Sequence, residues 1–347
     1  MFTFAVHCFI MRFILFGIIG SLLIACGETP TKSKVVTDID KLIKLYPDSV
    51  PVIIQHGQKM MERYDYDAAL KDGAKAYRLQ PNNLEARYLY ADALNNRANR
   101  TPEDVTQAQT HFKYVIKKQP KNLEALIDLA STYSYLGDFE KSFQYINTAL
   151  RIDKKYRDAY VLKGSNYMQL AGPKPDPNNT NRVLAKSSYQ TAIDQDPEFF
   201  EAYIFLGSLY QEEKNELCIE YFVTATQIRP GNIDGLYNLA YAYQEFDRDE
   251  EALAVYRQMA KKDPSFTPSL FQQGWIKQFH QKDIDSAMFF YNKCLQKEPR
   301  YVEAWHNLGM CYELKKDNTS AIEAYKKALK YNPDFELSRE AARKFKI

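Results

Sequence analysis

Histidine and cysteine are scarce in this chain, with five of each among its 347 residues, and only 13 residues are glycine. The sequence has no glycine-rich phosphate loop, no HExxH motif and no CxxC pair. Its histidines are scattered, so they lack the close spacing of metal ligands. These absences predict a protein that holds no metal and no cofactor.

The chain has almost no excess of charge of either sign, because 46 Lys and Arg residues balance 44 Asp and Glu residues. A net charge of +2 argues against nucleic acid as a partner held by bulk electrostatics. The apolar run from Phe13 to Ile24 is too short for a membrane-spanning helix, which needs about 20 residues.

That apolar run has the length of a signal-peptide core, and it ends at Leu23-Ile24-Ala25-Cys26. The tetrad resembles the bacterial lipobox. The resemblance implies that residues 1–25 are removed and that Cys26 is acylated, which anchors the chain in a bilayer. Gly27 favours sorting to the outer membrane. Two alternatives stay open: an uncleaved N-terminal membrane helix, and translation that begins at Met11 rather than Met1.

Proline recurs at intervals of about 34 residues, a period typical of helical repeats. The repeating positions are Pro47, Pro81, Pro120, Pro197, Pro230, Pro264, Pro299 and Pro333, with Lys154 where one more would fall. The last unit reads Trp305-x2-Leu308-Gly309-x2-Tyr312, then Ala321-x3-Tyr325-x2-Ala328-x4-Pro333. Large residues at i, i+3 and i+7 give the first helix an apolar stripe, and the small residue lets a second helix approach.

This pattern resembles the tetratricopeptide repeat, a pair of antiparallel helices. The resemblance implies an all-α solenoid, a right-handed superhelix of about eight helix-turn-helix repeats with capping helices at both ends. The predicted segments are residues 1–25 as signal peptide, 26–35 as a lipid-anchored polar tether, 36–47 as the N-terminal cap, 48–333 as eight repeats and 334–347 as the C-terminal cap. Extra residues at 95–104 and 171–182 are predicted to form loops between paired helices.

The repeats and caps use nearly all of the chain after the tether, so we expect no catalytic domain and no enzyme activity. Cys218, Cys294 and Cys311 fall at packing positions and are expected in the core. A disulfide between Cys294 and Cys311 stays an open alternative.

In the tetratricopeptide fold, the first helices of the repeats line a groove that binds peptides. The fifth position of each repeat is apolar or aromatic in nearly every copy: Ile54, Tyr88, Ile127, Val161, Ile204, Tyr237, Phe271 and His306. The resemblance predicts a peptide-binding groove formed by Tyr88, Asp128, Tyr237, Asn238, Tyr241, Phe271, Gln272, Trp275, His306 and Asn307. Tyr237, Tyr241, Phe271 and Trp275 are expected to form one aromatic platform, with Asn238 and Gln272 contacting a peptide backbone.

The sequence therefore predicts a scaffold that binds protein partners of the bacterial cell envelope. It would be tethered to the bilayer through Cys26 on the periplasmic side, in the outer membrane. Two other functions stay open: glycan binding, which tyrosine, tryptophan, asparagine and acidic side chains also suit, and a cytoplasmic interaction protein with an uncleaved N-terminal helix.

Overall fold

The computed structural model describes residues 38–345, so the predictions for the signal peptide, Cys26 and the tether lie outside the described residues. Within that range the chain forms 18 α-helices. None of these helices is long and apolar enough to cross a membrane. The predicted all-α architecture is confirmed.

The helices form two units, divided between Pro197 and Glu198. The first unit contains α1 (Ile39–Leu45), α2 (Val50–Glu62), α3 (Tyr66–Leu79), α4 (Leu84–Asn96), α5 (Pro102–Lys118), α6 (Leu123–Tyr135), α7 (Phe139–Ile152), α8 (Arg157–Ala171) and α9 (Thr180–Gln195). The second contains α10 (Phe200–Glu212), α11 (Leu217–Ile228), α12 (Ile233–Glu245), α13 (Asp249–Lys262), α14 (Thr267–Phe279), α15 (Ile284–Lys297), α16 (Val302–Leu314), α17 (Asn318–Tyr331) and α18 (Glu336–Phe345).

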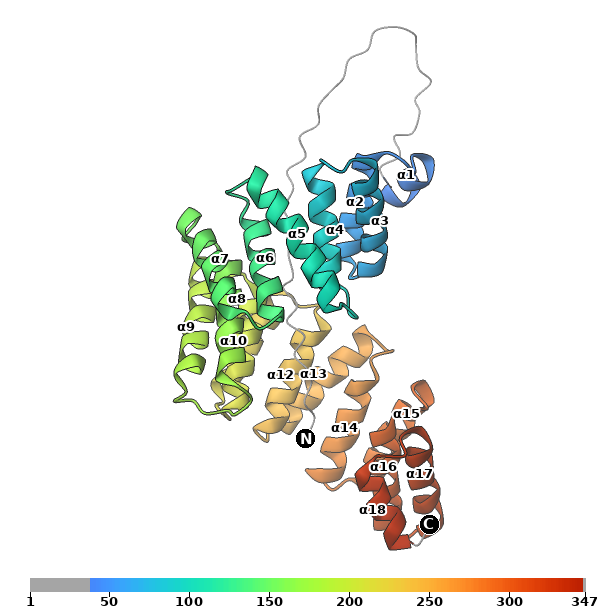
Figure 1. Cartoon of the computed structure of the whole chain (residues 1–347). Helices are drawn as coiled ribbons and strands as arrows, with labels where there is room; N and C mark the ends of the chain where they lie inside the picture. Colours follow the sequence, from blue (N-terminus) through green and yellow to red (C-terminus); the bar gives the residue numbers. More distant parts are fainter. Residues whose placement is uncertain (1–37, 346–347) are drawn as a thin grey trace, which may run out of the picture. The chain divides into compact units, whose positions relative to one another are not determined.

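Eight helix pairs, from α2 with α3 to α16 with α17, are the predicted repeats (Figure 1). α1 packs on α2 and α18 packs on α17, as expected for terminal helices. The two predicted insertions lie between α4 and α5 and between α8 and α9. Residues 97–101 and 172–179 are not helical, whereas the ends of both predicted ranges belong to the flanking helices.

Polar residues at regular positions set where the helices begin. Asn83, Asn122 and Asn232, just after the repeating prolines, accept a hydrogen bond from the backbone at the start of a first helix. Asp138 and Asp317 do the same for second helices. Each cap satisfies a backbone N–H that the helix leaves unpaired.

The core of a repeat is built on a small residue facing a large one. Gly309 of α16 lies against the ring of Tyr325 from α17, and a Cβ at Gly309 would come within 2.6 Å of that ring. Gly274 and Tyr291 repeat the arrangement in the preceding repeat. The glycine lets the two helices approach closely enough for the ring to be buried.

The three cysteines of the described chain are buried free thiols, as predicted for core residues. Burial raises the pKa of Cys294 and of Cys311 to about 12, which keeps both thiols protonated at neutral pH. The structure therefore has no disulfide between Cys294 and Cys311.

In the first repeat, Gly73 lets the backbone of α3 approach the backbone of α4 closely. A Cβ at Gly73 of α3 would lie 2.8 Å from Cα and N of Tyr90 in α4. Backbone atoms cannot rotate away, so Gly73→Ala should destabilise the first unit by about 1–2 kcal/mol despite the higher helix propensity of alanine. Urea denaturation and hydrogen exchange would measure the loss.

Gly231→Ala is the matched control, because its Cβ would meet only Nζ and Cε of the flexible Lys262. We expect this control to change stability by less than about 0.5 kcal/mol. Equal stability of Gly73→Ala and wild type would show that α3 and α4 are not as tightly packed as the structure has them.

Candidate binding face

The first helices of the second unit form a continuous layer. α10 contacts α12 and α14 contacts α16, in addition to the contact that each makes with its own second helix. Hydrogen bonds of Gln272 in α14 with Gln244 and Tyr237 connect α14 with α12. Side chains on this layer can therefore act together across repeats. We define the first-helix face by five residues of α12 and α14: Tyr237, Asn238, Tyr241, Gln272 and Trp275.

Tyr237 and Tyr241 form a stacked pair one helical turn apart on α12. Their ring centroids lie 6.2 Å apart and the ring planes differ by 5°. The edges of Tyr256 and Phe266 fix Tyr237 in place, with centroids 6.1 and 5.8 Å away. Tyr241 is 37% exposed. The pair thus presents one open ring on a rigid support.

A chain of hydrogen bonds connects the core to this pair. The Tyr256 hydroxyl donates to Oε1 of Gln244 over 3.2 Å, and Nε2 of Gln244 donates to Oε1 of Gln272 over 3.3 Å. Nε2 of Gln272 then donates to the Tyr237 hydroxyl over 3.1 Å. Burial raises the pKa of Tyr237, so its hydroxyl stays protonated at neutral pH while it accepts the bond from Gln272.

The two amides predicted to contact a peptide backbone differ in whether they already form hydrogen bonds within the protein. Gln272 uses both its carbonyl oxygen and its amide nitrogen in the internal chain. Asn238 is partly exposed, and no side-chain hydrogen bond engages it in the described part of the protein. Asn238 is therefore the amide that is open to a peptide backbone.

The four rings predicted as one platform divide into three contact groups. Phe271 stacks on Tyr301 with centroids 5.1 Å apart. Trp275 instead packs on Phe279 and His280, at 5.2 and 4.9 Å. No ring contact joins these groups to the Tyr237–Tyr241 pair among the residues that the structure describes. The four residues lie on adjacent first helices, as predicted, but Phe271 and Trp275 pack on other rings.

His306 and Asn307 are buried, and each is only 8% exposed. The His306 Nδ1 lies 3.0 Å from the hydroxyl oxygen of Ser338, and its ring packs on Phe335. Nδ2 of Asn307 donates to the Tyr291 hydroxyl over 3.2 Å. The structure thus removes both residues from the surface that a peptide could reach.

In the first unit the predicted groove residues hold the helices together. The Tyr88 hydroxyl donates to Asp128, a bond between α4 and α6, and Asp128 is buried. The fifth-position residues Ile54, Ile127 and Val161 are also buried. These residues belong to the core of the first unit rather than to an open groove: Ile54 packs with Ala76 and Ala86, and Ile127 packs with Ile146 and Ala159.

The twelfth position of each repeat has a role that the sequence pattern did not reveal. In the last three repeats this position accepts a hydrogen bond from a tyrosine of the second helix. The pairs are Tyr256 with Gln244, Tyr291 with Gln278, and Tyr325 with Glu313. The recurring Ala-x3-Tyr motif in α13, α15 and α17 is the signal that could have predicted these pairs.

Three segments match the tetratricopeptide repeat family: residues 123–156, 234–265 and 302–335. The BBSome complex member BBS4 homolog of Drosophila melanogaster is 23% identical over 74% of this chain and 54% of its own length. Human protein O-mannosyl-transferase TMTC3 is 26% identical over 82% of this chain and 32% of its own length. The chain thus spans about half or less of these two relatives.

Among solved structures, the C-terminal part of a tetratricopeptide repeat-containing protein from Cytophaga hutchinsonii is similar, with a TM-score of 0.56 and 18% identity. The match covers 73% of this chain and 98% of that one. The human IFIT1 dimer with m7Gppp-AAAA has a TM-score of 0.54 and 16% identity, covering 85% and 77%. At these identities the likeness concerns the fold alone.

Burial of His306 predicts a pH dependence of stability. Desolvation lowers its pKa from 6.5 to about 4, while the Glu313 carboxylate opposes the shift. In the unfolded chain the histidine is protonated as the pH falls below 6.5, whereas in the folded protein it stays neutral until about pH 4. The stability that is present above pH 6.5 is therefore lost as the pH falls from 6.5 to 4. The loss should be about 2 kcal/mol between pH 7.5 and pH 5.

His306→Gln should remove this contribution, since glutamine does not titrate. Urea denaturation at both pH values, with hydrogen exchange of α16 and α18, would compare the variant with wild type. The same loss of stability in both proteins would mean that His306 is not the responsible group.

Proposed function

Because the chain is a tetratricopeptide repeat protein, a class of protein-interaction scaffolds, we propose that it binds an extended peptide segment of a protein partner on its first-helix face. We also propose that it does so in the bacterial cell envelope, on the periplasmic side of the outer membrane, held by a lipid on Cys26. The proposal assigns the chain no catalytic role and no cofactor.

The observation that carries the proposal is the open aromatic ring beside open polar groups. Tyr241 exposes its ring, Asn238 offers an amide, and the Tyr237 hydroxyl has a proton to donate. An extended peptide needs this combination: its backbone pairs with the amide and hydroxyl, and an apolar side chain packs on the ring.

Rigidity of the site supports the same function. Tyr237 is fixed by two ring edges and by the hydrogen-bond chain from Tyr256 through Gln244 and Gln272. A ligand that binds here need not order these side chains, which lowers the entropic cost of association. Trp275, on the next first helix, adds a second partly exposed ring.

We expect Tyr241→Ala to weaken partner binding by about 2 kcal/mol, or ~30-fold in Kd, the scale of an aromatic hot spot. Trp275→Ala should act in the same direction, and Gln272→Ala should weaken binding indirectly by freeing Tyr237. The measurement is a quantitative pull-down from envelope extract, followed by calorimetry with the peptide segment that is recovered.

The matched control is Tyr331→Ala on α17, because Tyr331 is also 37% exposed but lies on a second helix. Circular dichroism should show all variants folded. If Tyr241→Ala and Tyr331→Ala recover the same partners in the same amounts as wild type, the first-helix face is not the binding site.

The anchor makes a separate prediction. Cys26→Ser should abolish palmitate labelling and either release the processed protein from membranes or leave the precursor uncleaved. Cys8→Ser is the control, since Cys8 lies in the segment that the signal peptidase would remove. Membrane attachment of Cys26→Ser with an intact N-terminus would favour an uncleaved helix instead.

A further inference from the structure

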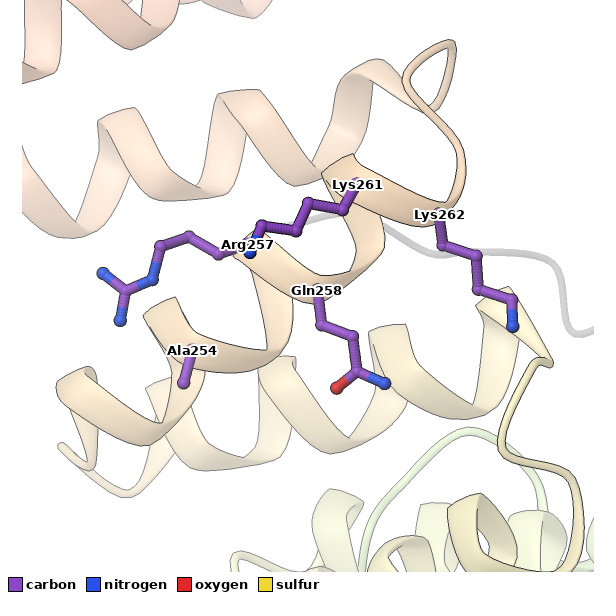
Figure 2. Close-up of a pocket in the computed structure, with 5 residues that line it drawn as sticks. All are labelled: Ala254, Arg257, Gln258, Lys261 and Lys262. Carbon is purple, nitrogen blue, oxygen red and sulfur yellow. The ribbon is translucent and has the colours of Figure 1, made fainter.

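α13 has a stripe of positive charge on its outward side that the proposed function does not use. Arg257, Lys261 and Lys262 are exposed and, with Ala254 and Gln258, line a shallow hollow of about 530 Å³ (Figure 2). We call these five residues the α13 stripe.

The cations of the α13 stripe lack acidic partners in the part of the chain that the structure describes. No ion pair involves any of the three, whereas Arg229 pairs with Glu201 and Arg248 pairs with Glu251. The nearest following carboxylate, Asp263, is engaged by the backbone N–H and the hydroxyl of Ser265.

Stability alone does not account for this arrangement. Lys261 and Lys262 lie in the last turn of α13, where the helix dipole favours cations. Arg257 lies before that turn and faces Lys261 at i+4, a like-charge pair that costs a few tenths of a kcal/mol. An anion between the two side chains would turn this repulsion into attraction.

The other second helices of the unit have a larger or acidic side chain at the position of Ala254. Cys218, Ala252, Ala287 and Ala321 occupy one buried position on α11, α13, α15 and α17, which aligns the four helices. Two residues later, where α13 has Ala254, the others have Glu220, Phe289 and Glu323. Glu323 pairs with Lys327 over 3.2 Å, and Phe289 lies under Lys293. Within this unit, α13 alone combines the small residue with unpaired cations.

The spacing of the α13 stripe selects the shape of its ligand. Residues four apart on a helix are separated by about 6 Å along its axis. Alternate residues of an extended chain lie about 6.6 Å apart on the same side. Carboxylates at alternate positions of an extended segment therefore match Arg257 and Lys261, and guanidinium binds carboxylate through two hydrogen bonds.

We propose that the α13 stripe binds an acidic extended segment, with Asp or Glu at alternate positions, of a second protein partner. Nζ of Lys262 lies against Gly231, in the turn between α11 and α12, where a Cβ would come within 2.7 Å of it. The stripe has no large apolar side chain, so it lacks the group that would insert into a bilayer. This site is separate from the first-helix face and does not depend on it.

The test uses the mature full-length protein and a fluorescein-labelled peptide with glutamate at four alternate positions, separated by threonine. Fluorescence anisotropy should show binding to wild type that weakens as salt rises. Arg257→Gln with Lys261→Gln should weaken binding at least 10-fold. A peptide of the same composition with its four glutamates adjacent should bind several-fold more weakly.

The matched control is Lys326→Gln with Lys330→Gln on α17, which removes two exposed cations at the same i,i+4 spacing beside Glu323. We expect less than a twofold change. Equal weakening by both pairs would mean general attraction to basic protein and would overturn the proposal. No measurable binding of the peptide, or vesicles of phosphatidylglycerol displacing it from the stripe, would overturn it as well.

Discussion

The packing of a second-helix ring on a first-helix glycine is the contact that joins the two helices in four of the repeats: Tyr189 on Gly164, Phe222 on Gly207, Tyr291 on Gly274 and Tyr325 on Gly309. Tyr325 on Gly309 and Tyr291 on Gly274 bring two backbones close enough that the ring is almost completely buried. The gain from burying a tyrosine is large, but its hydroxyl must then find a partner inside the repeat. This requirement connects the packing of the fold to its polar interior.

Hydrogen bonds between side chains connect the polar interior to the candidate site. The Tyr256 hydroxyl is satisfied by Gln244, whose amide is satisfied by Gln272, whose own amide reaches Tyr237 at the surface. In the last repeat the corresponding hydroxyl of Tyr325 donates to Glu313, which also pairs with Lys344 of α18, and no such chain continues to a surface ring. The same packing therefore leads to the candidate site in one repeat, whereas in the last repeat it leads to a contact with the C-terminal helix.

The sequence alone was sufficient to predict the helix pairs, because proline, the small residue and the ring recur in phase in most of the repeats. It failed where burial depends on a neighbouring repeat. Ile127 and Phe271 share the fifth position, yet the first is fully buried and the second is not. Gln272 and Asn238 are both amides at the sixth position, and only the pairing of Gln272 with Gln244 distinguishes them. A periodic pattern cannot reveal which side chains of adjacent helices bond to each other.

Positions that packing leaves undetermined are the ones where these repeats differ. The buried position of Cys218, Ala252, Ala287 and Ala321 stays small, while the exposed position two residues later is alanine, phenylalanine or glutamate. Core packing restricts the first set to small residues, because a larger side chain would push the helices apart. Packing does not restrict the residue type at the second, exposed position. Where side chains of one chemical kind gather there, the reason has to be a partner that contacts that surface. In a protein built of near-identical repeats, the departures from the repeat are therefore the best guide to its partners.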